Sequence, residues 1–296
     1  MDVLFLAPQL ILYIALTIVP FVVALPIVLT DRVDFLDQTV SFVGLKNFVA
    51  LFSLPIRDVF LPALSRTAVF VALNYAMVYL FGMSLALIMF EARTRLAQPF
   101  FVVLFLPLML SGVGAGMILT MLFARDSGTI NLLLLKLGVI GEAFDIKNPA
   151  ATAITLPLMV GWRYAGYNMA LFLSGLLGIP QQTIDASVVD GAGYWQRVRY
   201  IYVPQMVPAI VMATIFALIG SVGIFDEPVG MGGLFANRSA EYFAIVLYKF
   251  GFGGGASSSS PQSGTLAQAV AMSLTVYLPL IVVAFFLTRL QKKLQY

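Results

Sequence analysis

Long apolar stretches separated by polar segments run along the whole chain. Six of them reach the length of about 20 helical residues that a bilayer core requires, and they cover 3–29, 68–90, 99–124, 150–179, 203–225 and 264–288. Five contain no charged residue, and the fourth contains only Arg163. Strands of a membrane β-barrel are shorter, about ten residues, and alternate in polarity. The pattern therefore predicts an all-α integral membrane protein with six transmembrane helices in a single domain, 1–296.

The first apolar stretch is expected to remain in the protein as a membrane helix. Asp2 stands where a secretory signal carries basic residues, and the apolar run is longer than that of a signal. An even number of spans places both termini on one side of the membrane. The short segments on that side carry seven basic residues, Arg93, Arg95, Arg197, Arg199, Arg289, Lys292 and Lys293. This local basic excess predicts that both termini are cytoplasmic.

The composition agrees with a membrane protein and excludes several function classes. Hydrophobic residues make up 60% of the chain and charged residues 10%, where a soluble domain has about 25%. The chain has no His and no Cys, which removes disulfides, thiol nucleophiles, a His base and the usual zinc ligands. The net charge of +3 is small and scattered. We therefore expect no catalytic residue, no metal site and no nucleic-acid partner.

The cytoplasmic loop at 180–202 has a pattern of helix, break and helix. Pro180 favours a helix start, and Ile184 and Val188 share one face of that helix. Gly191 is suited to the left-handed conformation that ends a helix. A second helix is predicted from large apolar residues at helical spacing, Trp195, Val198 and Tyr202. This loop is expected to expose a small apolar stripe and two carboxylates that fit a groove on a partner protein.

This loop resembles the EAA coupling loop of ABC importer permeases. The family pattern is E-A-A-x-x-D-G-A, five residues, then F-x-x-I-x-L-P. The corresponding positions here are Asp185, Ala186, Ser187, Asp190, Gly191, Ala192, Val198, Ile201, Val203 and Pro204. The departures from the pattern are Asp185 for Glu, Ser187 for Ala, Val198 for Phe and Val203 for Leu. The Asp-Gly-Ala core and the final proline are intact.

Three further segments resemble the carbohydrate branch of this family. Residues 42–48 (FVGLKNF) are similar to the F-x-G-L-x-N-F element that follows the first helix in sugar and glycerol-phosphate importer permeases. Residues 6–10 (LAPQL) look like the opening of that first helix. Phe225-Asp226 and residues 230–233 (GMGG) resemble an F-D … GGP region, although Leu234 replaces the proline.

The resemblance implies a type I ABC importer permease with the MetI-like fold, in the inner membrane of a prokaryote. Such a chain forms half of a translocation pore with a second homologous permease. Its other partners are two ABC ATPase subunits, which bind ATP and magnesium, and an extracytoplasmic solute-binding protein, so no cofactor of its own is expected. The residues implied to enter the ATPase cleft are Asp185, Ala186, Ser187, Asp190, Gly191 and Ala192.

Polar residues inside the spans are candidates for the solute pathway, because such residues tend to face a cavity or a partner. They are Trp162, Arg163, Tyr164, Tyr167 and Asn168 on the fourth span and Asn74 on the second. Aromatic faces and amides suit a sugar ring. Contact between helices is the favoured role for Asn74, and contact between helices or extension to the membrane interface is the alternative role for Arg163. The sequence leaves open a monosaccharide, oligosaccharide, polyol or glycerol phosphate, and leaves open whether this chain holds a solute site.

Four other features carry structural expectations. Gly112 and Gly116 have the spacing that lets two helices pack closely. Asp226 and Glu227 are expected to be solvated loop acids rather than gate residues. Residues 242–248 are expected to form an interfacial helix, and the Gly/Ser tract at 253–261 a flexible connector.

Two other functions compete with the importer permease. An ion-coupled secondary transporter usually keeps acids or His inside its spans, and the predicted spans contain neither. A membrane-embedded enzyme would need a nucleophile and a base that converge within the membrane. The sequence therefore favours an ATP-driven importer, with the secondary transporter as the alternative.

Overall fold

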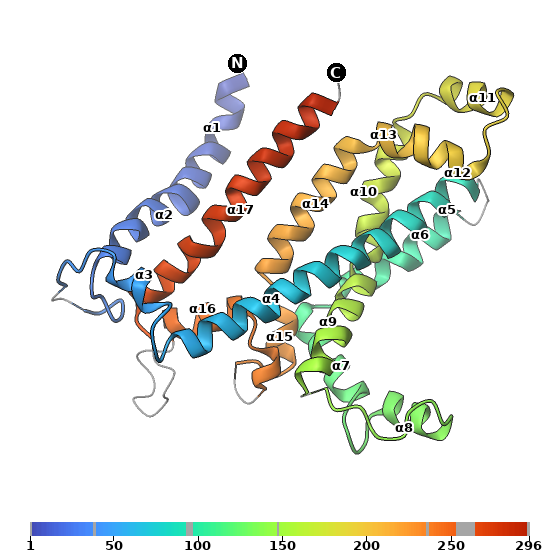
Figure 1. Ribbon diagram of the computed structural model, residues 1–296. Coiled ribbons are helices and arrows are strands. Elements are labelled where there is room, and N and C mark those ends of the chain that lie inside the picture. The colour runs from blue at the N-terminus through green and yellow to red at the C-terminus, as the bar shows by residue number, and fades with distance from the viewer. Residues whose placement is uncertain are drawn as a thin grey trace. The chain divides into compact units, whose positions relative to one another are not determined.

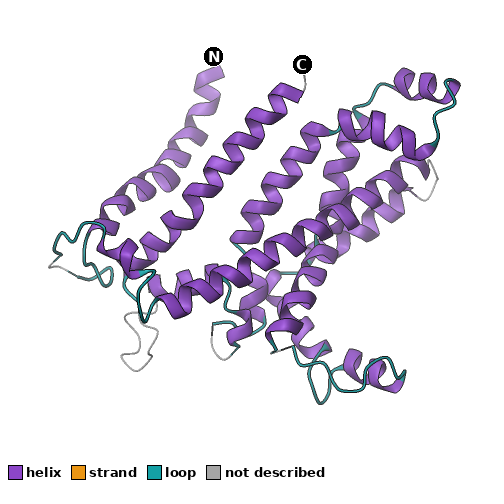
Figure 2. Cartoon of the chain, viewed as in Figure 1, coloured by secondary structure: helices purple, strands orange, loops and turns teal. Residues whose placement is uncertain are grey.

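The computed structural model describes residues 2–37, 40–92, 97–146, 148–234, 237–252 and 264–294. The backbone in these ranges is almost entirely helical (Figure 1, Figure 2). An antiparallel bridge between Thr30 and Phe42 is the one β pairing in the described part of the chain. The expected all-α fold is thus confirmed. Arg93, Arg95 and the tract at 253–261 lie outside the described residues.

The chain divides into two compact units. The first comprises residues 1–64 and 245–279, and it contains α1 (Asp2–Tyr13), α2 (Val19–Ala24) and α3 (Lys46–Ala50). The second comprises residues 65–244 and 280–296. Three helices have residues in both units: α4 (Arg57–Met77), α16 (Phe243–Phe252) and α17 (Leu266–Leu294).

The second unit contains the remaining helices, from α5 to α15. They are α5 (Ser84–Ala92), α6 (Ala97–Phe105), α7 (Gly112–Leu122), α8 (Thr129–Lys136), α9 (Pro149–Arg163), α10 (Ala165–Leu177), α11 (Gln181–Val189), α12 (Tyr194–Arg197), α13 (Val203–Gln205), α14 (Val207–Val222) and α15 (Asp226–Gly230). Short π-helical segments connect α1 to α2, α4 to α5 and α12 to α13, at Ile14–Ile18, Val78–Met83 and Val198–Tyr202.

Four helical stretches in the described residues are long and apolar enough to cross a membrane. They are Leu6–Leu29, Arg57–Glu91, Val207–Gly230 and Leu266–Lys293. The expected third span is a pair of helices, Pro99–Met109 and Gly112–Leu122, bent by 89°. The expected fourth span is also broken, into α9 and α10 at Tyr164. The count of six spans remains a prediction that treats each broken pair as one span.

The break in the third span has a local cause. Ser111 has an extended backbone, and its side-chain oxygen accepts a hydrogen bond from the Gly114 amide at 3.0 Å. A serine in this position caps the start of a new helix, because it satisfies an amide that has no partner within the helix. Hydropathy does not register such a cap, so the apolar pattern predicts one continuous span where the structure has two helices.

In the first unit, the contacts of Asn47 give a structural reason for the motif at residues 42–48 (FVGLKNF). Its side chain is buried, and its amide nitrogen donates to the carbonyls of Val28 and Thr30, at 2.7 Å each. The last carbonyls of a helix have no partner within the helix, and Asn47 satisfies two of them at the end of the first span. Gly44, with φ of +61°, provides the turn that brings Asn47 back to this helix end.

In the second unit, the glycines at 112 and 116 pack against α15, as their spacing predicts. A Cβ atom added at Gly116 would lie 2.2 Å from the carbonyl oxygen of Glu227 and 3.0 Å from the Cα of Gly230. One added at Gly112 would lie 2.4 Å from the Cβ of Asp226. Side chains on these glycines would therefore push α15 away from α7.

We predict that Gly116→Ala destabilises the purified, assembled permease by about 1–3 kcal/mol, the usual cost of overpacking. Thermal unfolding in detergent or nanodiscs measures this effect. Gly220→Ala is the matched control, since a Cβ there has no neighbour within 4 Å. Equal stability of the Gly116→Ala variant and the control would contradict the close packing of α7 on α15.

Candidate functional site

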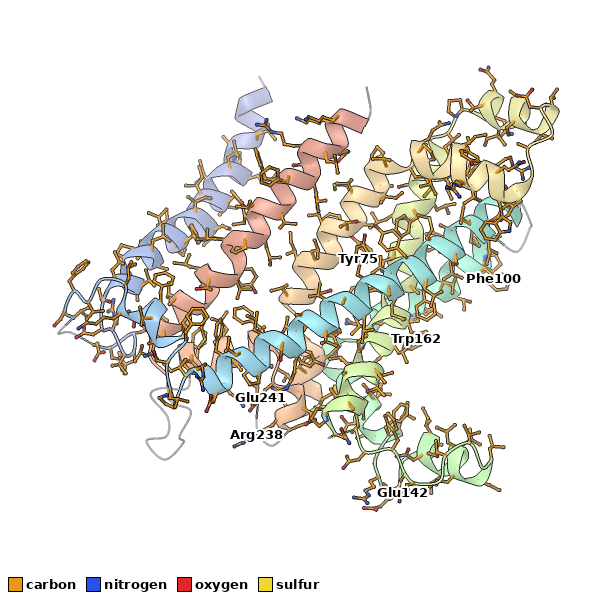
Figure 3. All side chains as sticks on the ribbon, in the orientation of Figure 1. Tyr75, Phe100, Glu142, Trp162, Arg238 and Glu241 are labelled. Carbon is orange, nitrogen blue, oxygen red and sulfur yellow. The ribbon has the colours of Figure 1, made fainter. Side chains whose placement is uncertain are left out.

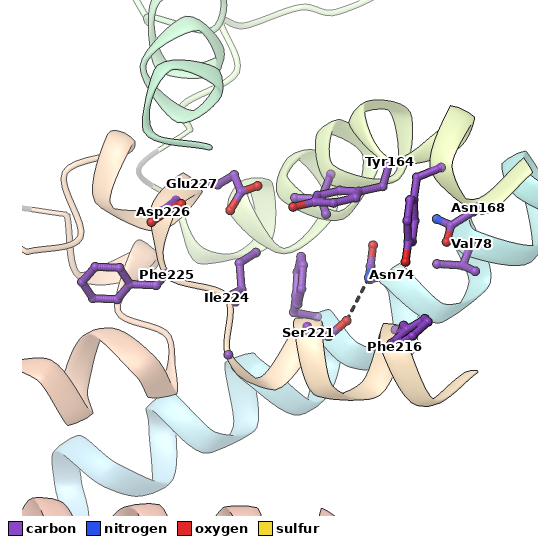
Figure 4. Close-up of a pocket in the computed structure, with 16 residues that line it drawn as sticks. Asn74, Val78, Tyr164, Asn168, Phe216, Ser221, Ile224, Phe225, Asp226 and Glu227 are labelled. Carbon is purple, nitrogen blue, oxygen red and sulfur yellow. Dashed lines mark hydrogen bonds between the residues drawn. The ribbon is translucent and has the colours of Figure 1, made fainter. Parts of the chain in front are cut away.

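A cavity of about 290 Å³ lies in the second unit, between the helices α4, α9, α10, α14 and α15 (Figure 4). Its walls combine aromatic rings, two amides and two carboxylates. The lining residues are Phe70, Asn74, Val78, Val160, Tyr164, Tyr167, Asn168, Phe216, Ala217, Gly220, Ser221, Gly223, Ile224, Phe225, Asp226 and Glu227. A pocket with mostly apolar walls and a few polar groups is the usual form of a small-molecule site.

The structure brings four of the six predicted pathway residues to this cavity: Asn74, Tyr164, Tyr167 and Asn168. Trp162 does not line it. Its side chain (Figure 3) is 52% exposed and borders a separate apolar cavity of about 310 Å³. A helix turns about 100° per residue, so positions 162 and 164 point in different directions. Arg163 is not among the lining residues either.

Asn74 makes the interhelical hydrogen bond predicted for it. Its amide nitrogen on α4 donates to the Ser221 hydroxyl on α14 at 2.8 Å (Figure 4). Both side chains are buried, and both line the cavity. The bond therefore joins two walls of the cavity and fixes the direction of the Asn74 amide.

Arg163 forms a buried ion pair with Glu227 of α15, and the two residues are 8% and 5% exposed. Its Nε donates to the carbonyl oxygen of Leu110 at 3.0 Å, in the bend before α7. Its guanidinium carbon lies 5.0 Å from the centroid of the Tyr164 ring. Arg163 thus connects α9, α15 and the bend, and Tyr164 in turn forms part of the cavity wall.

The expectation that Asp226 and Glu227 are solvated loop acids is wrong for Glu227, which is buried and paired. Asp226 is exposed, and both residues line the cavity. Both also fall within the apolar helical stretch Val207–Gly230, so acids are not confined to the loops. The missed signal was Arg163, because a lone cation inside a span needs an acidic partner.

The segment 180–202 adopts the predicted helix, break and helix. The helix α11 begins directly after Pro180 and ends at a glycine with φ of +77°, Gly191. The Gly191 amide donates to the Val188 carbonyl at 3.1 Å, and the Ala192 amide donates to the Ser187 carbonyl at 2.9 Å. This pair of bonds is the Schellman arrangement, which satisfies the last carbonyls of a helix.

The exposed face of this segment differs from the expected one. Ile184 is 8% exposed and packs in a core cluster with Phe172, so it belongs to no exposed stripe. The large apolar side chains that do face outward are Val188 at 55%, Val189 at 86%, Trp195 at 74% and Tyr200 at 69%.

The residues that match the EAA pattern also divide into exposed and buried ones. Asp185, Ala186, Asp190 and Gly191 are exposed, Ala192 is half-buried, and Ser187 is buried with its hydroxyl bonded to a backbone carbonyl. The exposed surface of the segment is thus two carboxylates beside two valines.

An anchor that the sequence does not reveal attaches this segment to the end of α5. The Tyr202 hydroxyl donates to the Glu91 carboxylate at 2.7 Å, and Arg197 lies 3.3 Å from the same carboxylate. Burial, and then the Glu91 charge, raise the pKa of the Tyr202 hydroxyl, so it keeps its proton at neutral pH. Arg197 also donates to the Ala192 carbonyl at 3.2 Å. These contacts therefore join the segment 180–202 to the end of α5.

The described residues contain no group of three or more His, Asp or Glu side chains that could hold a metal ion.

Residues 78–296 match the model of a protein family described as "Binding-protein-dependent transport system inner membrane component". The lactose transport system permease protein of Rhizobium radiobacter is 29% identical over 226 residues, which cover 76% of this chain and 73% of that protein. The sn-glycerol-3-phosphate transport system permease protein of Agrobacterium fabrum is 27% identical over 281 residues, 93% of this chain and 92% of that protein.

Solved structures show the same fold. A chain of a bacterial ABC transporter involved in the import of the acidic polysaccharide alginate matches 98% of this chain and 94% of its own length, with a TM-score of 0.76 and 18% identity. A chain of the methionine ABC transporter MetNI matches 82% of this chain and 99% of its own length, with a TM-score of 0.57 and 16% identity.

We predict that Arg163→Met destabilises the assembled protein by about 3–5 kcal/mol, since it leaves the Glu227 carboxylate buried without its partner. Chemical or thermal unfolding of the purified complex gives this value. Arg57→Met is the control: it removes a pair with Asp58 whose side chains are 49% and 64% exposed, and such pairs contribute at most about 1 kcal/mol. An Arg163→Met variant as stable as the control would contradict a paired, buried Glu227.

Proposed function

The chain belongs to the binding-protein-dependent transport system inner membrane components, and from this membership we propose that it forms half of the translocation pore of an ATP-driven sugar importer. Its relatives are permease subunits of sugar transport systems rather than enzymes. The solute proposed here is a sugar or a related polyol or glycerol phosphate. The observation that carries the proposal is the cavity that contains Asn74, Tyr164, Tyr167 and Asn168.

The cavity has the chemistry that a sugar requires. The rings of Tyr164 and Tyr167 offer flat apolar faces for a pyranose, and the amides of Asn74 and Asn168 donate and accept hydrogen bonds to hydroxyls. Its volume of about 290 Å³ is at the lower end of the range for small-molecule sites. We therefore assign these four residues to the solute pathway, with the second half of the site supplied by the partner permease.

The segment 180–202 is the proposed docking element for the ATPase. Its exposed surface of Asp185, Asp190, Val188 and Val189 suits the groove of a partner in the helix-in-groove mode. Buried side chains and the anchor to Glu91 keep the segment rigid. ATP-driven closure of the two ATPases would then move the attached helices as rigid bodies.

The remaining assembly follows from the same family. The proposed partners are a second homologous permease, two ABC ATPases that bind ATP and magnesium, and an extracytoplasmic solute-binding protein. The chain is an inner-membrane component, and we propose that both termini lie in the cytoplasm, on the side of the ATPases.

The first prediction from this proposal concerns the energy source. The permease, reconstituted with its partner subunits and loaded binding protein, is expected to take up labelled sugar only with ATP on the ATPase side. Uptake into proteoliposomes measures this. Uptake driven by a proton or sodium gradient without ATP would contradict the importer and favour the secondary transporter.

The second prediction concerns coupling. Gly191→Pro is expected to reduce the amount of solute transported per ATP hydrolysed at least about fivefold. Destabilising the end of α11 by about one or two kcal/mol is enough to change the population of the folded segment by such a factor. Proline cannot adopt the φ of +77° at this position, and it lacks the amide that donates to Val188. Parallel assays of ATP hydrolysis and uptake by the assembled complex measure the ratio.

Gly138→Pro is the matched control for this variant. Gly138 has φ of +68° and ends α8 with the same pair of amide bonds, but it lies between α8 and α9, away from the segment 180–202. An unchanged coupling ratio in Gly191→Pro, or an equal loss in both variants, would contradict the docking role.

A further inference from the structure

The two ends of the cavity differ in chemistry. Asn168 and Val78 lie at one end, and Asp226 and Glu227 lie at the other (Figure 4). Both acids follow α14, at the start of the short helix α15 that packs against the glycines of α7. Because a Cβ at Gly116 would meet the Glu227 backbone, the position of this acidic end is fixed by close backbone packing.

Arg163, the cation that contacts this end, is already paired with an acid. Arg163 pairs with Glu227 and donates to the Leu110 carbonyl, and it lies outside the lining of the cavity. This pairing balances Glu227. The Asp226 side chain is exposed, and the lining residues that the structure describes include neither Lys nor Arg. The described lining at this end of the cavity therefore carries one net negative charge, that of Asp226.

We propose that the acidic end formed by Asp226 and Glu227 makes this cavity select uncharged polyhydroxyl solutes and reject phosphorylated or carboxylated ones. The inference rests on the proposed function, because it concerns the solute of the same cavity. Sugar hydroxyls donate hydrogen bonds to carboxylates, and bonds to a charged acceptor are stronger than neutral ones. A phosphate or carboxylate at the same place meets the like charge of Asp226, which disfavours its binding about fivefold at a separation of about 4 Å, even at the dielectric constant of water.

The absence of cysteine from the chain provides a direct test. Gly220 lines the cavity, and a Cβ added there has no neighbour within 4 Å, so Gly220→Cys introduces one thiol without displacing the wall. The variant is assembled with its partner subunits in nanodiscs. It is then treated with a cationic methanethiosulfonate (the ethyltrimethylammonium reagent) or an anionic one (the ethylsulfonate reagent). Mass spectrometry of this chain gives the rate at which each reagent modifies the introduced thiol. The same reagents with a free thiol in solution give the intrinsic ratio of the two modification rates.

We expect the cationic reagent to be favoured at the introduced thiol at least about tenfold beyond that intrinsic ratio. Adding Asp226→Asn should reduce this preference at least about threefold, and adding Asp126→Asn should leave it unchanged. Asp126 is the matched control, since it is exposed and does not line the cavity. Glycerol 3-phosphate is expected not to slow the labelling.

The two possible failures are distinguishable. A thiol that reacts with neither reagent would show that water-soluble compounds do not enter the cavity, which would overturn the proposed function. A thiol that reacts with no preference for the cation, or is protected by glycerol 3-phosphate, would overturn only the selection against anions. A preference for the cationic reagent that Asp226→Asn leaves unchanged would also overturn the selection against anions, because the preference would then come from other charges.

Discussion

The need to neutralise one buried guanidinium, that of Arg163, shapes the central part of this protein. An arginine in the bilayer core costs at least about 2.5–3.5 kcal/mol, unless it is paired within the protein or reaches water. Arg163 meets this constraint with Glu227 and with the Leu110 carbonyl. Arg163 and these two partners come from three segments far apart in the chain, so one side chain holds together the end of α9, the bend before α7 and the helix α15.

The cavity depends on this arrangement. The helix α9 ends at Arg163, and α10 begins two residues later, which places Tyr164, Tyr167 and Asn168 on the cavity wall. The helix α15 closes the opposite end because Gly112 and Gly116 let it approach α7. The coupling segment lies in a separate cluster with Phe172 and Tyr202 at its centre, and α10 contributes to both regions. In the function proposed above, α10 is the helix that would connect movement of the docking element to the cavity.

Much of the fold, but less of the site, is predictable from the sequence. Hydropathy predicts the helical class because burial in lipid is a property of each segment alone. The sequence of 180–202 predicts its helix, break and helix because a Schellman turn depends on a few local residues. The breaks at Ser111 and Tyr164 are missed, since hydropathy does not record where a helix is interrupted. The pairing of Arg163 with Glu227, and the burial of Ile184, depend on contacts between distant segments, which no local pattern contains.

Arg163 and Glu227 are expected to stabilise the permease as a pair. A double-mutant cycle in the assembled transporter measures this coupling, with Arg163→Met, Glu227→Gln and the double variant compared by unfolding free energy. A paired arrangement predicts that the double variant is more stable than the sum of the two single losses implies, by about 1–3 kcal/mol. Additive losses, with no coupling between the two positions, would contradict the account.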